Sequence, residues 1–403
     1  MSQRKNKFFK EKKKWSLTKD KILGKYLVPY FQKLMCYGRP ICYVDCFAGK
    51  GKFDDGQDGS PLIALKCLDK TLSKSSRNIP VYSYFIELNH YTDLEKNIRL
   101  YLTSFKNISK IEYSVKSGKF EDNIDSILSE HKDSTVFLYI DPYGIKAIDV
   151  EKFNKFKTDE KKSVELLINF NTWGFFREAC RVLKVDFKLN PEIEKYLVEY
   201  DSNNNLNREE LCKIAGGDFW IEIVKKYKNK ELKANEAEYE LAKNIAEKFR
   251  KMYKYTLNVP VMSSDSSSIP KYRLFYLTNH TDGYLIMADI MFHELEEAKI
   301  RQRNGQMDLF STDTEGKITQ DEDIEKLIKT MIKMYNEHID ALLCRVYTEY
   351  GLIAQSSKLR EIIKDMEDNE ILLITREPMY TKTGKLSSFM IESKGQYVYV
   401  RRK

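Results

Sequence analysis

Short apolar segments alternate with longer amphipathic segments over the first two-thirds of the chain. The apolar segments are rich in β-branched and aromatic residues, which favour buried strands, and the segments between them carry apolar residues at helical spacing. Such alternation is typical of a parallel sheet covered by helices on both faces. The expected strands are Tyr43–Phe47, Val81–Ile86, Ile111–Val115, Thr135–Ile140, Val164–Phe170, Tyr255–Val261 and Tyr272–Thr278. We expect the last two to close the sheet as a hairpin-like edge.

An amphipathic helix is expected over Leu17–Cys36, before the first strand, with a kink at Pro29. Its apolar positions face the sheet, so we expect Lys19, Lys21 and Lys25 on or near its exposed face. Further helices are expected over Tyr91–Tyr101, Phe120–His131 and Asn235–Met252. Between the fifth strand and the last of these helices, residues 175–230 break the alternation, which predicts an inserted helical element that contacts substrate.

The last part of the chain has a different pattern. The polar segment 301–323 indicates a linker, and helical segments followed by a two-stranded basic hairpin are typical of a winged helix. The expected helices are 324–337, 340–350 and 356–366, and the expected strands are 371–375 and 397–402. Two uses of this domain are open, contact with a protein or a second copy, or contact with nucleic acid through Lys358, Arg360, Lys364, Lys382, Lys385, Arg401 and Arg402.

Composition narrows the class of protein. The chain of 403 residues has a net charge of +8, which mildly favours a polyanionic partner, although much of the surplus lies in the run Arg4–Lys14 and a solvated basic tail explains it equally well. The 7 cysteines include no C-x-x-C pair, and the 5 histidines are scattered, so we expect reduced thiols and no metal site. No apolar run reaches membrane-spanning length and Met1–Lys14 lacks the apolar core of a signal peptide, so we expect a cytoplasmic protein without a membrane partner.

A glycine turn follows the first expected strand. Gly49 and Gly51 can adopt backbone angles closed to other residues and let a ligand approach the main chain, while Asp45 offers a carboxylate at the strand end. A lone G-x-G turn is also common as a plain structural turn. The turn becomes informative because polar residues end three further strands, at Glu87, at Ser117 with Gly118, and at Asp141.

Ligands of open α/β sheets collect outside the carboxyl ends of the strands, so these endings define one expected crevice. An acid in the position of Glu87 is placed to accept hydrogen bonds from ribose hydroxyls, although it could instead cap the next helix. Four residues beyond the fifth strand could extend the crevice, of which the two aromatic ones fit the core equally well: Asn169, Asn171, Trp173 and Phe176.

The sequence Asp141-Pro142-Tyr143-Gly144 carries the most chemical meaning. A carboxylate can accept a hydrogen bond from an amine while the neighbouring ring stacks on a planar base, which orients the amino nitrogen toward a methyl donor. An ordinary Asp-Pro turn is the alternative. Nucleophilic hydrolysis and Walker-type phosphate binding are disfavoured, because the chain has neither a G-x-S-x-G elbow nor the spacing of a P-loop.

Several of these motifs, in this order, resemble those of the three-Cys-motif partner proteins, a family that is similar to class I S-adenosylmethionine-dependent methyltransferases. The likeness spans roughly Leu17–Lys299. It is carried by Asp45–Gly51, Asp58–Leu62, Phe85–Glu87, Ile140–Gly144 and Tyr272–Thr278 with Ile290 and Met291. The expected α/β fold is therefore a Rossmann-like methyltransferase domain over residues 1–300 with a helical insertion at 175–230, a linker over 301–323, and a winged-helix-like domain over 324–403.

The resemblance also implies a cofactor and partners. S-adenosylmethionine would be held by Asp45, Phe47, Gly49, Gly51, Glu87, Ser117, Gly118 and Asp141. The triplet Asp141-Pro142-Tyr143 matches the catalytic motif that amino-methyltransferases use on exocyclic amines, with one proline here where those enzymes usually carry two. The implied partner is a three-Cys-motif iron–sulfur protein of the radical type, often linked to phage or mobile elements.

Three functions follow from these observations. The first is methyl transfer to an amine of a nucleic acid. The second is a non-catalytic or differently reacting partner module of the iron–sulfur protein. The third is an NAD-dependent enzyme, which the incomplete glycine motif disfavours.

Overall fold

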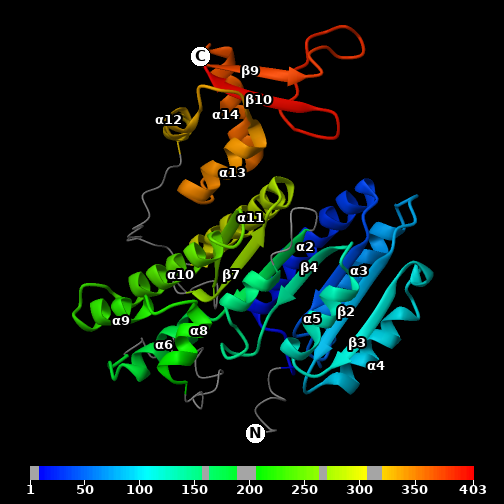
Figure 1. Cartoon of the computed structure of the whole chain (residues 1–403), viewed down its shortest axis with the longest axis vertical. Helices are drawn as coiled ribbons and strands as arrows, with labels where there is room; N and C mark the ends of the chain where they lie inside the picture. The colour runs from blue at the N-terminus through cyan, green and yellow to red at the C-terminus, as the bar shows by residue number, and fades with distance from the viewer. Residues whose placement is uncertain (1–8, 157–162, 188–205, 263–269, 306–319) are drawn as a thin grey trace. The chain divides into compact units, whose positions relative to one another are not determined.

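The computed structural model describes residues 9–156, 163–187, 206–262, 270–305 and 320–403. The chain divides into two compact units, Met1–Asn279 and His280–Lys403 (Figure 1). The division falls before the expected boundary at residue 300. Parts of the basic run Arg4–Lys14, of the insertion at 175–230 and of the segment expected to be a linker at 301–323 lie outside the described residues.

The first unit is built on a seven-stranded sheet with the order β3-β2-β1-β4-β5-β7-β6. Neighbouring strands from β3 to β5 are parallel, and β7 is antiparallel to both β5 and β6. The prediction of a mostly parallel sheet with a hairpin-like edge is confirmed. The strands are β1 Ile41–Asp45, β2 Val81–Glu87, β3 Glu112–Ser117, β4 Thr135–Ile140, β5 Val164–Phe170, β6 Tyr255–Met262 and β7 Pro270–Thr278.

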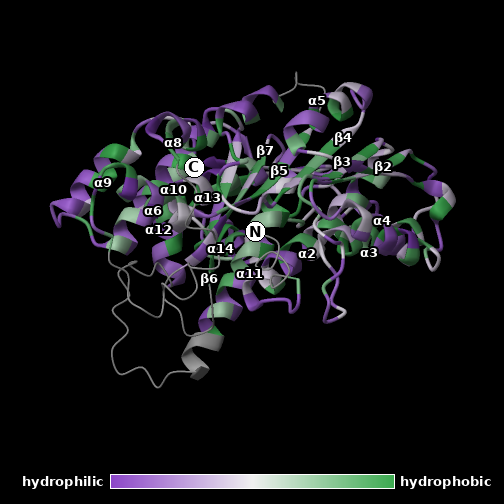
Figure 2. Cartoon of the chain, turned by 90° about the horizontal axis from the view of Figure 1, so that it is seen from below, coloured by the Kyte–Doolittle hydropathy of each residue, from purple (hydrophilic) through white to green (hydrophobic). Residues whose placement is uncertain are grey.

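Burial follows the position of each strand in the sheet. Every residue of β1, β4, β5 and β7 is buried, whereas β3 at the open edge has none that is. Central strands that are covered on both faces are mainly apolar, which explains why they read as nearly continuous hydrophobic runs in the sequence. In Figure 2 the central strands are mainly green, and the helices around them carry purple on their outward sides.

Helices cover both faces of this sheet. They are α2 Lys14–Tyr37, α3 Ser60–Leu72, α4 Tyr91–Leu102, α5 Phe120–Glu130, α6 Thr172–Val182, α8 Arg208–Ala215, α9 Trp220–Lys228 and α10 Ala234–Arg250, with 3-10 turns at Ile108–Lys110 and Glu151–Phe156. The helix α2 contains Pro29 and carries Lys21 and Lys25 on its exposed side. The expectation for Lys19 is wrong, because this residue is buried.

The helical insertion adds to the hydrophobic core. Trp173 and Phe176 of α6 are completely or almost completely buried and pack with residues of α8, α9 and α10 in one cluster. They are therefore core residues rather than part of a pocket. The helices α8 and α9 keep their place because α6 and α10 offer a continuous apolar surface to them.

The second unit combines helices with a small antiparallel sheet of order β8-β10-β9. Its elements are α11 Thr281–Gly305, α12 Asp321–Met331, β8 Glu337–His338, α13 Ile339–Tyr350, α14 Ser356–Asp368, β9 Leu372–Glu377 and β10 Tyr397–Arg402. Two expectations are corrected. The helix expected over 324–337 ends at Met331, because Ile332 takes an extended backbone and Glu337–His338 pairs with β10. The segment expected to be a linker begins within α11.

Among the described residues, no helix is both long and apolar enough to cross a membrane.

Candidate functional site

A cavity of about 470 Å³ opens at the carboxyl ends of β1, β2, β3 and β4. This is the edge at which open α/β sheets hold their ligands, next to the point between β1 and β4 where the strand order reverses. The residues proposed from the sequence that line it are Phe47, Gly49, Gly51, Glu87, Gly118, Asp141, Pro142 and Tyr143. Asp45 is buried and does not line it, and Ser117 is exposed at the end of β3 outside the lining.

Glycine is favoured at two places in the turn after β1 and at a third place that packs against this turn. Gly49 and Gly51 have φ angles of +60° and +74°, in the region that favours glycine. A Cβ on Gly59 would lie 3.1 Å from the carbonyl oxygen of Gly51, to which the Gly59 amide donates a hydrogen bond of 2.8 Å. The turn is also held from α4, where the Asn97 amide nitrogen donates to the Lys50 carbonyl at 2.8 Å.

Glu87 fixes the loop after β2 to this turn. One of its carboxylate oxygens accepts the amides of Asn89 and His90 at 2.7 and 3.0 Å, and the other accepts the amide of Gly49 at 2.9 Å. A carboxylate has about four acceptor positions in all. Glu87 therefore has capacity on the second oxygen for one donor from a ligand in the cavity, such as a ribose hydroxyl.

The N-terminal segment lies against the glycine turn. The Phe9 ring is 4.9 Å from the ring of His90, and a Cβ on Gly49 would lie 3.2 Å from it. The Asp54 amide donates to the Phe9 carbonyl at 2.7 Å. Lys12 is buried, and its ammonium group forms an ion pair of 2.5 Å with Asp20 of α2. In the described part of the basic run, Phe9 and Lys12 therefore pack against the site, while Lys10 and Lys14 are exposed.

Asp141 accepts hydrogen bonds from side chains on three elements. The Lys19 ammonium group of α2 lies 2.9 and 2.6 Å from its two oxygens. The Asn169 amide of β5 donates to it at 2.7 Å, and the Tyr139 hydroxyl lies at 3.4 Å. These contacts use the acceptor positions that the carboxylate offers. In this arrangement, the ammonium group of Lys19 stands where an amine donor to Asp141 would bind.

Asp45 is the most deeply buried acid of the site. Its side chain is completely buried, and one of its oxygens has no hydrogen-bond partner among the described residues. Burial raises the pKa of the Asp45 carboxyl from 3.8 to about 7, while a hydrogen bond with Ser60 lowers it and the charge of Asp141 raises it further. Burial also raises the pKa of Asp20, which Lys12 and Lys19 oppose.

Three lysines surround the cavity on its exposed side. Lys52, Lys119 and Lys146 line it and are themselves exposed. None of the three forms an ion pair with another residue in the described part of the chain. Unpaired cations around an opening attract anionic ligands and raise their local concentration.

The other residues proposed from the sequence lie elsewhere. The Asn171 side chain caps α6 by accepting the Gly174 amide at 2.8 Å. Asn169 reaches the site through its contact with Asp141. No residue of the described insertion lines the cavity, so its predicted role in substrate contact stays a prediction.

Reading the sequence missed Phe9, Lys12, Lys19 and Asp20 as site residues. A signal for Lys19 was present, because it lies four residues after Trp15 and three before Ile22, on the apolar side of the helix. A charged residue on a buried face needs a partner of opposite charge. The pattern therefore predicts that Lys19 is paired, although it does not say with which residue.

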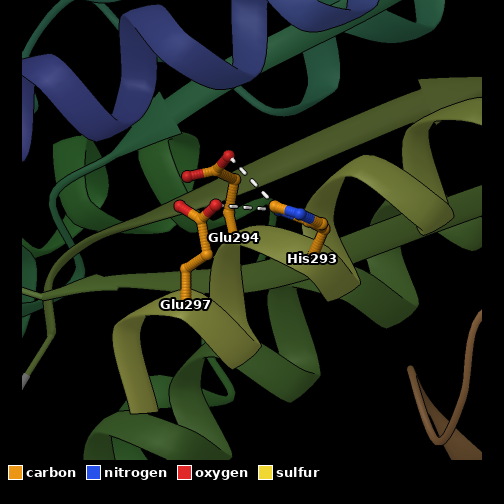
Figure 3. A group of neighbouring side chains, drawn as sticks. All are labelled: His293, Glu294 and Glu297. Carbon is orange, nitrogen blue, oxygen red and sulfur yellow. Dashed lines mark ion pairs between the residues drawn. The ribbon is translucent and has the colours of Figure 1, made fainter. Parts of the chain in front are cut away.

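A second group of ionisable side chains lies on α11 in the other unit. Figure 3 shows His293, Glu294 and Glu297 turned toward one another. The His293 ring nitrogen is 3.9 Å from Glu294 and 3.4 Å from Glu297, and among the described residues this is the one group with metal-ligand character. All three side chains come from a single helix, and His293 and Glu297 have the i,i+4 spacing of an ordinary helical ion pair. The 7 cysteines are free thiols.

Neither models of known protein families nor curated proteins give a match to this chain.

Proposed function

We propose that the protein binds S-adenosylmethionine in the cavity of the first unit and methylates an amine of a nucleic acid. One observation carries the proposal, namely that the cavity lies at the carboxyl ends of β1 to β4 in a sheet whose antiparallel β7 is inserted between β5 and β6. The dinucleotide-binding order lacks this inserted strand. An inserted antiparallel strand is typical of class I methyltransferases, the class to which the sequence motifs are similar.

The residues present fit such a cofactor. Cavities for ligands of this size measure roughly 300–1,000 Å³, and this one has about 470 Å³. The glycine turn brings the main chain to the cavity wall, Glu87 retains acceptor capacity for a hydroxyl, and Asp45 adds a buried carboxyl next to the turn.

S-adenosylmethionine supplies an already activated methyl group, so the protein mainly has to align the acceptor and exclude competing reactions. Pro142 and Tyr143 line the same cavity as Asp141. Tyr143 is half exposed, which leaves part of its ring available to a planar base. The exposed Lys52, Lys119 and Lys146 would meet the phosphates of a nucleic acid.

The order of elements in the second unit also favours a nucleic acid as the methyl acceptor. Its elements follow the order α12-β8-α13-α14-β9-β10, with the short β8 pairing beside β10. We infer that this part of the unit is a winged helix, a fold that many nucleic-acid-binding proteins use.

Isothermal titration tests cofactor binding. We expect the full-length protein to bind S-adenosylmethionine, and Glu87→Gln to weaken binding about tenfold through the loss of one charged acceptor. Glu112→Gln is the matched control, since Glu112 is an exposed acid on β3, outside the cavity lining. Absence of binding to the wild type, or equal affinity in both variants, contradicts the proposal.

Methyl transfer is tested with labelled donor and fractionated RNA, DNA and protein. We expect label in a nucleic-acid fraction and its loss in Asp141→Ala. Label that appears only in protein contradicts the acceptor class and leaves cofactor binding intact.

The contacts of Asp141 favour a second candidate, the non-catalytic or differently reacting module. Lys19 and Asn169 already use its acceptor positions, so an acceptor amine must displace the Lys19 ammonium group. In this candidate the unit binds the cofactor and acts through a three-Cys-motif iron–sulfur partner. Cofactor binding without methyl transfer, together with co-purification of that partner, favours it over the first.

A further inference from the structure

Charge is unevenly distributed along the C-terminal part of the second unit. From residue 321 to residue 370, which spans α12, α13 and α14, acidic residues outnumber basic ones by 12 to 7. From residue 371 to residue 403, basic residues outnumber acidic ones by 7 to 2. The helices are therefore the acidic part of this unit, and the β9–β10 hairpin, residues 371–403, is its basic part.

The basic residues of α14 are already paired. Lys358 lies 2.8 Å from Asp321, and Lys364 lies 2.6 Å from Asp368. Arg360 is buried and donates to Asp340 at 2.6 Å. A helix that presents paired lysines among acidic residues attracts phosphates weakly, because the acids compete for the same cations.

Most basic residues of the β9–β10 hairpin are unpaired, unlike those of α14. Five of them are exposed and have no ion pair in the described part of the chain: Lys382, Lys385, Lys394, Arg401 and Arg402. The remaining two basic residues form ion pairs, Arg376 with Glu367 of α14 and Lys403 with Glu370. Available positive charge in this part of the unit is therefore concentrated on the hairpin.

Backbone hydrogen bonds hold the loop that carries two of these lysines in a defined shape. The Thr381 amide donates to the Lys385 carbonyl at 2.7 Å, and the Ser387 amide donates to the Met379 carbonyl at 2.9 Å. Tyr380 and Leu386 form a bridge across this loop. The loop is thus a small hairpin that extends from the connection between β9 and β10 (Figure 1).

Apolar side chains accompany the lysines on this loop. Met379, Tyr380 and Leu386 are between 55% and 66% exposed. Exposed apolar residues beside unpaired cations suit a partner that offers both negative charge and a flat or apolar surface. A nucleic-acid groove offers phosphates at its edges and base or sugar surface between them.

We propose that the second unit binds duplex nucleic acid through the β9–β10 hairpin, with Lys382 and Lys385 on phosphates and Tyr380 in the groove, while α14 makes no groove contact. The proposal deepens the proposed function and rests on its nucleic-acid acceptor. Charge complementarity favours a duplex as the ligand. The five unpaired cations of the hairpin match the regular phosphates of a duplex, whereas the acidic helices of the same unit repel phosphates.

The salt dependence of binding provides the test. Fluorescence anisotropy is measured with the full-length protein and short labelled duplexes of DNA and of RNA over a series of salt concentrations. Each phosphate contact contributes about 0.9 to the slope of log K against log salt. We expect Lys382→Ala/Lys385→Ala to reduce this slope by about 2 and to weaken binding about tenfold at low salt. The duplex that binds more tightly identifies the type of nucleic acid.

Two further variants make the result specific. Lys358→Ala/Lys364→Ala removes the same charge from α14, and we expect its slope to equal that of the wild type. Tyr380→Ala is expected to weaken binding with the slope unchanged, which separates groove contact from phosphate contact. Circular dichroism confirms that each variant is folded. An α14 variant that reduces the slope as much as the hairpin variant overturns the proposal.

A wild type that binds neither duplex also overturns it. Cofactor titration is independent of this outcome, because the cofactor cavity is formed by residues of the first unit alone. Failure of hairpin binding with intact cofactor binding rejects this inference only, and failure of cofactor binding rejects the proposed function.

Discussion

Two carboxylates of the cavity, Glu87 at the β2 end and Asp141 at the β4 end, are held in different ways. Glu87 accepts backbone amides from its own loop and from the glycine turn. Asp141 accepts side chains from α2 and β5. Backbone donors stay in place whatever the side chains are, whereas a side-chain donor can be moved or removed. The β2 end is therefore preorganised, and the β4 end can exchange partners.

The largest effect is expected from Asp141→Ala. The change leaves the Lys19 ammonium group, whose side chain is only 6% exposed, without its carboxylate partner. Breaking one side of a buried pair costs about 3–5 kcal/mol of the free energy of unfolding. Urea unfolding followed by tryptophan fluorescence measures it well, because Trp15, Trp173 and Trp220 all lie in the first unit.

Two controls give this result its meaning. Lys19→Met/Asp141→Leu removes both charges, and we expect it to recover most of the lost stability. Arg99→Ala breaks an exposed pair with Glu95 on α4, and we expect it to leave the free energy of unfolding almost unchanged. If the double variant is as unstable as Asp141→Ala, the cost does not come from an unpaired lysine.

The next effect concerns Asp45, which lies between the two ends. Burial raises the pKa of its carboxyl from 3.8 to about 7, so between these values the folded protein keeps a proton that the unfolded chain releases. The contribution of Asp45 to the free energy of unfolding therefore falls as pH rises through this interval, by at most about 1.4 kcal/mol per pH unit. Above the interval this contribution no longer changes with pH. We expect Asp45→Asn to lack this loss, measured as the difference in unfolding free energy between the variant and the wild type across the interval.

The same measurement sharpens the comparison between the two ends. The charge of Asp141 contributes to the raised pKa of Asp45, so Asp141→Asn should narrow the pH interval over which stability is lost. Glu87→Gln should leave the interval unchanged, since Glu87 is not among the causes of that raised pKa. If the pH interval narrows equally in both variants, the charge of Asp141 is not what raises the pKa of Asp45.

The β2 end could be predicted from the sequence, because its contacts are local or run between adjacent strands. The apolar runs at Val81–Glu87 and Ile41–Asp45 place the glycine turn and Glu87 next to each other once the strands pair in parallel. Which partners Glu87 takes follows from the path of the loop. The sheet and the position of the cavity were predictable for the same reason, since periodicity and strand endings are properties of short segments.

The β4 end could not be predicted in the same way. The pair between Lys19 and Asp141 joins residues 122 positions apart, and it depends on how α2 lies over the sheet. Burial of Lys19 was readable from its apolar neighbours, whereas its partner was not. The short strand β8 was missed because two residues carry too little pattern to distinguish a strand from the end of a helix.

The smallest effect is expected from two glycines that make a matched pair, one in the glycine turn and one in the loop that follows it. Gly49 and Gly56 both have positive φ angles, of +60° and +85°, so alanine at either position costs about 1–2 kcal/mol in backbone strain. A Cβ on Gly49 also meets the Phe9 ring at 3.2 Å inside the cavity wall, whereas a Cβ on Gly56 meets nothing within 4 Å.

The two variants should therefore be similar in stability and different in cofactor binding. We expect Gly49→Ala to weaken the binding of S-adenosylmethionine about tenfold in isothermal titration, because the added methyl group displaces the turn from the ligand. A tenfold change in affinity corresponds to about 1.4 kcal/mol of binding free energy. Gly56→Ala should bind as the wild type does. Because the main chain preorganises the β2 end, a single added methyl group there should lower the affinity for the ligand. If both variants bind like the wild type, the turn tolerates the methyl group and does not contact the cofactor.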